Sequence, residues 1–241
     1  MAHNLVQLDG SLAADEVHFW VVGHDINELE IARLFELLNQ EEQARAERFK
    51  VSEPRKQFII SRATLRTILG KYLKLEPEQV VLRVGMNSKP ELGQHTDLRF
   101  NLSHTDGKTA IGITRGRNVG VDVERIRENL DPLELAQRFF SPRESQWLRA
   151  QPAASRYSAF FACWTAKEAY VKACGIGLSM PLAEFGVRPE EGNLKVDFEI
   201  YGKPEESKQW TLWQPDLGSD FRSAVAVAGQ NMTLCIGDFS R

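Results

Sequence analysis

Residues Val119–Glu124, with the sequence VGVDVE, alternate valines with small or acidic residues. This period of two is typical of a β-strand, because successive side chains of a strand point to opposite faces. The valines are expected to face a core, and Asp122 and Glu124 to share the other face. Two such carboxylates can bind a hard cation such as Mg²⁺, which prefers oxygen ligands. An exposed polar face of a half-buried strand is the simpler explanation of this stretch taken alone.

The segments around this strand predict an α+β protein. Before it come a strand at Glu16–Val22, two short helices, a long helix that opens at Ser52, and short strands; after it come helices, a long helix that ends at Gly175, and five short strands. Alternating runs of helices and strands favour α+β over a doubly wound sheet. We expect two pseudo-symmetric lobes, residues 1–116 and 117–241. Each would pack a long helix on a small, mostly antiparallel sheet, with a site in the seam between them.

The composition is that of an ordinary globular protein. The 241 residues are 42% hydrophobic and 26% charged, with a net charge of −3, which is unlike a disordered chain. No apolar run approaches the roughly 18 residues of a membrane helix, and the N-terminus lacks the basic-then-apolar order of a signal peptide. The three cysteines form no CxxC motif, which argues against a disulfide framework or a zinc cluster. We expect a cytoplasmic protein with reduced thiols.

Residues 45–66 are strongly basic, with seven lysines and arginines against two glutamates. A local positive surface on a mildly acidic protein suits a small polyanion or an acidic partner better than long nucleic acid. A solvated helix face explains the same charge equally well at this point.

A second motif is WTAKEAYVK at Trp164–Lys172. In a helix it places Trp164, Glu168 and Lys172 on one face, because they recur every four residues. A carboxylate and an amine behind an aromatic ring could line a cleft. An ordinary surface Glu–Lys pair is the simpler explanation of this motif taken alone.

A third motif, FNLSHTDG at Phe100–Gly107, predicts a strand that breaks at Ser103 into a turn. The turn would present the serine hydroxyl, the His104 imidazole and backbone N–H groups, which suit phosphate oxygens. A turn-capping serine and a structural histidine are the alternative. Lys89, held beside Pro90, is a further candidate phosphate contact.

Together these motifs resemble those of the 4′-phosphopantetheinyl transferase superfamily, in its long, two-lobed Sfp-type form. The resemblance covers roughly residues 41–182. It rests on FNLSHT (Phe100–Thr105), GVDVE (Gly120–Glu124), RFFSPRE (Arg138–Glu144) and WTAKEAYVKACGIGL (Trp164–Leu178), with SKP at Ser88–Pro90.

The resemblance implies an enzyme that moves the phosphopantetheine arm of coenzyme A to a serine of an apo acyl or peptidyl carrier protein and releases 3′,5′-ADP. It implies Mg²⁺, with Mn²⁺ as an alternative, held by Asp122, Glu124 and Glu168. Glu168 would also be the base, and Lys172 would lie at the transferred phosphoryl group. The implied coenzyme A contacts are Arg45, Arg62, Ser88, Lys89, Asn101, Ser103, His104 and Lys172.

The resemblance also implies a docking surface for the acidic carrier protein, formed by the Leu133–Phe140 segment and the cationic helices of the first half. We expect a monomer, since the second lobe already supplies the interface that a one-lobed enzyme gains by assembly, and neither nucleic acid nor membrane as a partner. Two other functions stay open: a metal-dependent nuclease that uses the same three carboxylates, and a non-catalytic module that binds coenzyme A or a carrier protein.

Overall fold

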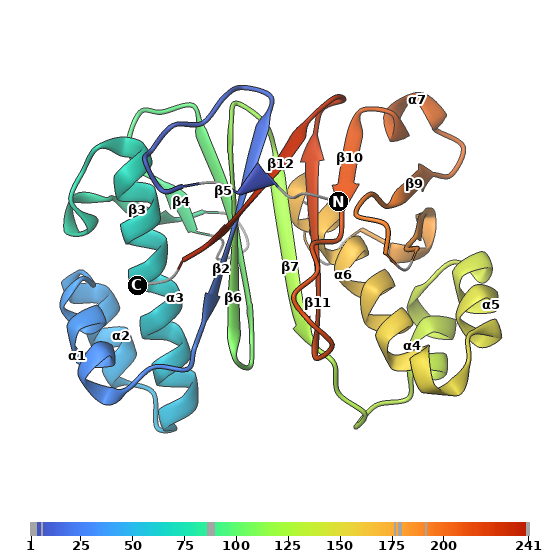
Figure 1. Ribbon diagram of the computed structural model, residues 1–241, viewed down its shortest axis with the longest axis horizontal. Coiled ribbons are helices and arrows are strands. Elements are labelled where there is room, and N and C mark those ends of the chain that lie inside the picture. Colours follow the sequence, from blue (N-terminus) through green and yellow to red (C-terminus); the bar gives the residue numbers. More distant parts are fainter. Residues whose placement is uncertain are drawn as a thin grey trace.

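The computed structural model describes residues 4–5, 7–85, 90–175, 177, 180–190 and 192–239. Ser88 and Lys89, two of the expected coenzyme A contacts, therefore lie outside the described residues. The chain folds into four layers, in the order helix, sheet, sheet, helix (Figure 1). The expected α+β class is confirmed. In the part of the chain that the structure describes, no helix has both the length and the apolar character to span a membrane.

The first half of the chain supplies one outer helical layer and the larger sheet. Its helices are α1 (Glu28–Glu36), α2 (Gln40–Glu47) and α3 (Ser52–Leu73), and its strands are β1 (Asn4–Leu5), β2 (Glu16–Gly23), β3 (Leu82–Val84), β4 (Pro90–Leu92), β5 (Leu98–Thr105) and β6 (Lys108–Arg115). The long helix α3 buries its apolar side chains, among them Leu65, Leu69 and Tyr72, against one face of this sheet.

The second half supplies the smaller sheet and the other helical layer. Its helices are α4 (Pro132–Phe139), α5 (Pro142–Ala150), α6 (Arg156–Cys174) and α7 (Pro204–Ser207), and its strands are β7 (Val119–Arg125), β8 (Phe185–Arg188), β9 (Asp197–Ile200), β10 (Trp210–Trp213), β11 (Phe221–Ala228) and β12 (Thr233–Asp238). Strands β10, β11 and β7 form an antiparallel sheet, and α6 packs against β7 and β11. The helix ends at Gly175, whose φ of 73° is the left-handed conformation that glycine adopts readily.

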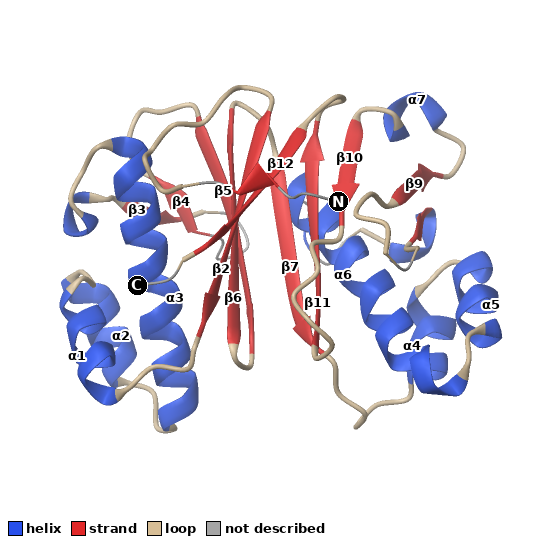
Figure 2. Cartoon of the chain, viewed as in Figure 1, coloured by secondary structure: helices blue, strands red, loops and turns tan. Residues whose placement is uncertain are grey.

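The last strand, β12, leaves its own half and joins the sheet of the other. The order of the five-stranded sheet is β1-β12-β2-β6-β5, and β12 pairs in parallel with both β1 and β2 (Figure 2). The division at residues 116 and 117 stays a prediction. The structure adds that a segment assigned to the second lobe completes the first sheet.

Strand β5 corrects one expectation. The sequence predicted that the strand breaks at Ser103, but Ser103, His104 and Thr105 continue it and pair with β6. The turn is confined to Asp106 and Gly107, where the glycine takes a φ of 87°. The strand extends because Ser103 and Thr105 point inward and find polar partners on the neighbouring strand β7.

Strand β7 lies between two layers, as its alternating sequence predicts. Val119, Val121 and Val123 are buried in the core between the two sheets. The opposite face lies against α6, and at Gly120 the approach is so close that an added Cβ would lie 2.0 Å from the carbonyl oxygen of Ala169. A glycine is therefore required here for β7 to dock on the helix.

Replacing Gly120 by alanine is expected to lower the free energy of unfolding by about 1–3 kcal/mol or more, because backbone atoms of α6 must move to admit the methyl group. The matched control is Gly23→Ala, since an added Cβ at Gly23, the last residue of β2, meets no atom within 4 Å. It should change stability by no more than about 0.5 kcal/mol. Urea denaturation measures both variants, and equal stability of the two would contradict the close approach.

Candidate functional site

The two sheets meet where β5 and β7, which belong to different sheets, run side by side. Alternate side chains of β5 reach across to β7: Asn101 Oδ1 accepts a hydrogen bond from the backbone N–H of Val121 at 2.8 Å, and Thr105 Oγ1 accepts one from that of Arg125 at 3.1 Å. Between them, Ser103 Oγ donates to Asp122 Oδ1 at 2.8 Å. These three β5 side chains are all buried. We call this contact the seam.

Asp122 is the centre of the seam. Its carboxylate is buried, and its Oδ1 accepts from Ser103 and also from the ammonium of Lys172, whose Nζ lies at 2.6 Å. Lys172 Nζ also lies 2.9 Å from Ser103 Oγ. The structure thus brings together three predicted site residues from two strands and a helix. It pairs Lys172 with Asp122 and not with Glu168, one turn earlier in α6.

The second oxygen of Asp122 supports a cation at this place. Oδ2 is buried and has no hydrogen-bond partner among the described residues, which costs free energy unless a donor or a cation is supplied. Burial raises the pKa of Glu124 and of Glu168, and repulsion from the Asp122 carboxylate raises both further. A group of carboxylates that repel one another in a partly buried place fits a divalent cation, whose charge would stabilise the ionised forms.

The three carboxylates are not gathered into a finished coordination shell. Their oxygens do not all lie within 4.8 Å of one another. Among the described residues, one other group of three possible metal ligands does lie that close together. Glu124 is engaged by Arg127, whose Nη1 lies 3.0 Å from its Oε2. Asp122 is already neutralised by Lys172. In this arrangement the lysine ammonium supplies the positive charge at Asp122.

The first half of the chain holds two arginines close together, and one of them also has an acidic partner: Arg62 Nε lies 3.4 Å from Glu42 Oε1. Arg45 on α2 and Arg62 on α3 both lie over the ring of Phe58, with their Cζ atoms 5.0 and 5.7 Å from its centroid. Burial lowers the pKa of the Arg62 guanidinium, and the charges of Arg45 and Arg66 lower it further, while Glu42 opposes them. Guanidinium groups held near one another on an aromatic ring are suited to binding a polyanion.

His104 links this positive group to the seam. Partial desolvation lowers the pKa of its imidazole, and the charges of Lys172 and Arg62 lower it further. His104 therefore lies close enough to Lys172 of the second half and Arg62 of the first half for both charges to act on its imidazole. The two cations disfavour the protonated imidazole, and a bound anion would offset their charge.

On α6, the predicted face is confirmed. Between Phe160 and Ala173 the half-buried residues are Trp164, Glu168 and Lys172, and the others are buried. The sequence assigned no role to the intervening Lys167. Its ammonium is fully buried, lies 2.9 Å from Glu144 Oε1, and donates to two backbone carbonyls, of Leu182 and Phe185. Because Lys167 is anchored on one side of the helix, Glu168 must face another direction, about 100° around the axis.

The structure gives Asn101 a contact that was not expected, and it shows a role for Arg127. Asn101 was expected to contact coenzyme A, and the structure gives its side chain a different contact, with the backbone of β7; the coenzyme contact stays a prediction. Arg127, which holds Glu124, was missed by sequence reasoning. Its position three residues after Glu124 could have indicated an ion pair. The strand ends at Arg125, however, so neither strand nor helix periodicity predicts that the two side chains meet.

The chain is similar in sequence to known proteins over most of its length. The family model described as "4'-phosphopantetheinyl transferase superfamily" matches residues 118–228, and the one described as "4'-phosphopantetheinyl transferase, N-terminal" matches residues 26–114. The 4′-phosphopantetheinyl transferase HetI of Nostoc sp. is 37% identical over 223 residues, which cover 91% of this chain and 90% of that protein. The Sfp enzyme of Bacillus subtilis is 26% identical over 204 residues, 84% of this chain and 88% of that protein.

A solved structure is similar over part of the chain. The Chronobacterium ammoniagenes ACPS–CoA complex matches 47% of this chain and 98% of its own, with 24% identity and a TM-score of 0.35.

The charge arrangement around His104 predicts its titration. Replacing Arg62 by glutamine should raise the pKa of the His104 imidazole toward its ordinary value, because one repelling charge is removed. An NMR titration of the histidine signals, with His104→Gln to assign the resonance, measures this. The control is Arg149→Gln, at an exposed position on α5, which should leave the pKa unchanged. Inorganic pyrophosphate should also raise it, and an unmoved pKa in both tests would contradict the arrangement.

Proposed function

Because this chain belongs to the 4′-phosphopantetheinyl transferase superfamily, we propose that its seam transfers the phosphopantetheine arm of coenzyme A to a serine hydroxyl of an apo carrier protein. The products are the holo carrier protein and 3′,5′-ADP. The state of the Asp122 carboxylate is the observation that connects this reaction to particular residues. Its Oδ2 is buried and has no hydrogen-bond partner among the described residues, and its charge acts on Glu124 and Glu168 nearby.

The positive group of the first half is proposed to bind the phosphates of coenzyme A. Arg45 and Arg62 lie close together over Phe58, and His104 lies near Arg62. The electrostatic cost of keeping the two guanidinium groups together falls when an anion binds. Ser103, whose hydroxyl donates to Asp122 in this structure, is proposed as a further phosphate contact on β5. Ser88 and Lys89 remain proposed contacts by resemblance.

Asp122, Glu124 and Glu168 are proposed to hold Mg²⁺, or Mn²⁺ in its place. When bound, the ion supplies charge neutralisation for the diphosphate oxygens, which the three carboxylates would otherwise repel. Asp122 Oδ2, for which the described residues offer no hydrogen-bond partner, supports this ligand set. Lys172, which lies at the same carboxylate, is proposed to contact the phosphoryl group that is transferred or the oxygen that leaves.

Glu168 is proposed as the base. When the ion is bound, its charge and that of Lys172 would favour the ionised carboxylate, which is the form that can accept a proton. It would accept the proton of the serine hydroxyl as the serine oxygen forms its bond to phosphorus and the bond to the leaving 3′,5′-ADP breaks. Since phosphoryl transfer needs little covalent help, positioning and charge balance are the main tasks of the site.

The carrier protein is proposed to dock beside α4. Its helix presents the half-buried Phe139, over which Arg138 lies, to the half-buried Trp164 on α6, with ring centroids 6.2 Å apart. Trp164 shares its helix face with Glu168 and Lys172. An arginine and two aromatic rings that lead to the reacting groups are suited to an acidic partner.

The deciding experiment mixes the protein with coenzyme A, Mg²⁺ and an apo acyl carrier protein and follows the carrier by intact-protein mass spectrometry. The carrier should gain the mass of one phosphopantetheine group, and chelation of Mg²⁺ should stop the reaction. Coenzyme A binding without any gain of mass would show a binding module instead. Cleavage of plasmid DNA in the presence of Mg²⁺ would favour the nuclease.

Asp122→Asn and Glu168→Gln are each expected to lower the transfer rate about 100-fold or more, since each removes a charge that the transition state requires. Both should remain folded by circular dichroism. The matched control, Glu205→Gln on the exposed helix α7, makes the same chemical change far from the seam residues in sequence and should keep normal turnover. Normal turnover of the Asp122 and Glu168 variants would refute the ligand set.

Transfer is expected to slow as ionic strength rises, mainly through a weaker apparent affinity for the carrier protein, because salt screens attraction between an acidic carrier and the basic surface. Initial rates at a series of carrier and NaCl concentrations separate affinity from turnover. Arg138→Gln should weaken carrier affinity and flatten its salt dependence. Kinetics that do not respond to salt would remove the electrostatic part of the docking proposal.

A further inference from the structure

Three side chains of metal-ligand type converge on the five-stranded sheet, away from the seam. Glu16 and His18 lie two residues apart on β2, and Cys235 lies on β12. One donor atom of each lies within 4.8 Å of the other two. Among the described residues this is the one trio of histidine, cysteine or carboxylate groups that comes so close. None of its members takes part in the proposed transfer.

The strand register explains the convergence. In the parallel pairing of β12 with β2, Cys235 is the partner of His18, and Thr233 is the partner of Glu16. Paired residues of neighbouring strands point to the same face, and so do residues two apart on one strand. Glu16, His18 and Cys235 therefore share one face, the face that packs against α3, as the contact of His18 with Tyr72 of that helix shows.

The imidazole of His18 is held in the orientation that a metal ligand needs. Its Nδ1 lies 2.6 Å from the Tyr72 hydroxyl oxygen, and that oxygen accepts a hydrogen bond from Trp20 Nε1 at 3.0 Å. The other nitrogen, Nε2, faces Glu16, with 3.3 Å to Oε2. Histidine ligands commonly have one ring nitrogen on the metal and the other fixed by a polar neighbour of this kind.

The surrounding charge favours a cation. Asp9 interacts electrostatically with His18, and Asp15 with Cys235. Among the described residues, no lysine or arginine forms an ion pair with Asp9, Asp15 or Glu16. Glu16 is about one-third exposed, while His18 and Cys235 are buried, so an ion could enter past the glutamate.

We propose that Glu16, His18 and Cys235 bind a divalent metal ion of the Zn²⁺ class, with water as a fourth ligand. One nitrogen, one sulfur and one carboxylate oxygen suit a borderline ion such as Zn²⁺ and do not suit Mg²⁺, which prefers oxygen alone. On binding, the Cys235 thiol releases its proton to solvent and becomes a thiolate. The His18 ring stays neutral, with its proton on Nδ1 directed at Tyr72.

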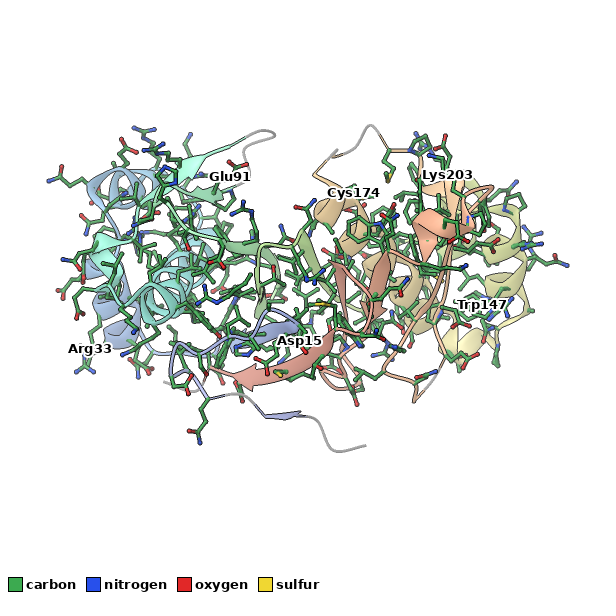
Figure 3. All side chains as sticks on the ribbon, turned by 90° about the horizontal axis from the view of Figure 1, so that it is seen from above. Asp15, Arg33, Glu91, Trp147, Cys174 and Lys203 are labelled. Carbon is green, nitrogen blue, oxygen red and sulfur yellow. The ribbon has the colours of Figure 1, made fainter. Side chains whose placement is uncertain are left out.

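The ion would tie β12 to β2 and so fasten the end of the second half to the first. This site is separate from the seam: Asp15, the neighbour of Glu16, lies on the opposite side of the molecule from Cys174, two residues beyond Lys172 (Figure 3). The proposal is therefore independent of the transferase assignment.

The test is titration of metal-free protein with Co²⁺, whose spectrum reports a sulfur ligand by a thiolate-to-metal charge-transfer band. One equivalent of Co²⁺ should produce this band, and Zn²⁺ should displace it. Cys235→Ser should abolish the band. The matched control, Cys174→Ser at the end of α6, should keep it, and so should Glu168→Gln, because oxygen ligands at the seam give no such band.

A second measurement covers the case that Cys235→Ser fails to fold. Zn²⁺ should raise the thermal unfolding midpoint of the wild-type protein, and Glu16→Gln, at a partly exposed position, should weaken Zn²⁺ binding at least about tenfold while the metal-free variant stays folded. The absence of a charge-transfer band in the wild-type protein would overturn the proposal. Persistence of the band in folded Cys235→Ser, or Zn²⁺ binding by Glu16→Gln at wild-type affinity, would also do so.

Discussion

Alternate polar side chains of β5 join the two halves of this protein. β5 and β7 belong to different sheets, and the hydrogen bonds described between them run from Asn101, Ser103 and Thr105 to the backbone and side chain of β7. Because these groups are buried, each must keep its partner, so the relative position of the strands is closely defined. Asp122 is thereby held at the boundary, where Lys172 and the basic groups of the first half can act beside it.

The local parts of this arrangement could be predicted from sequence. The valines of β7 face the core and Trp164, Glu168 and Lys172 share a helix face, because both facts follow from the period of a single element. The non-local parts could not. That Lys172 meets Asp122 and not Glu168 depends on how α6 docks on β7, which Gly120 permits.

The extension of β5 shows why the site was only partly predictable. Read alone, Ser103 to Gly107 has the composition of a turn, since serine, aspartate and glycine all favour turns. The polar partners on β7 make strand conformation favourable as far as Thr105, and these partners are distant in sequence. The same limit applies to Glu16, His18 and Cys235, whose residue numbers give no metal-ligand spacing and which meet through sheet register.

The pairing of β12 with strands of the first half affects how the chain reaches its native state. This strand lies between β1 and β2 and is formed by residues close to the C-terminal end of the described chain. During synthesis, β2 therefore has no partner strand on one side until Thr233–Asp238 has left the ribosome. Until β12 is in place, the open edge of β2 can pair with a strand of another chain. Removal of β12 would leave this edge open in the folded protein as well.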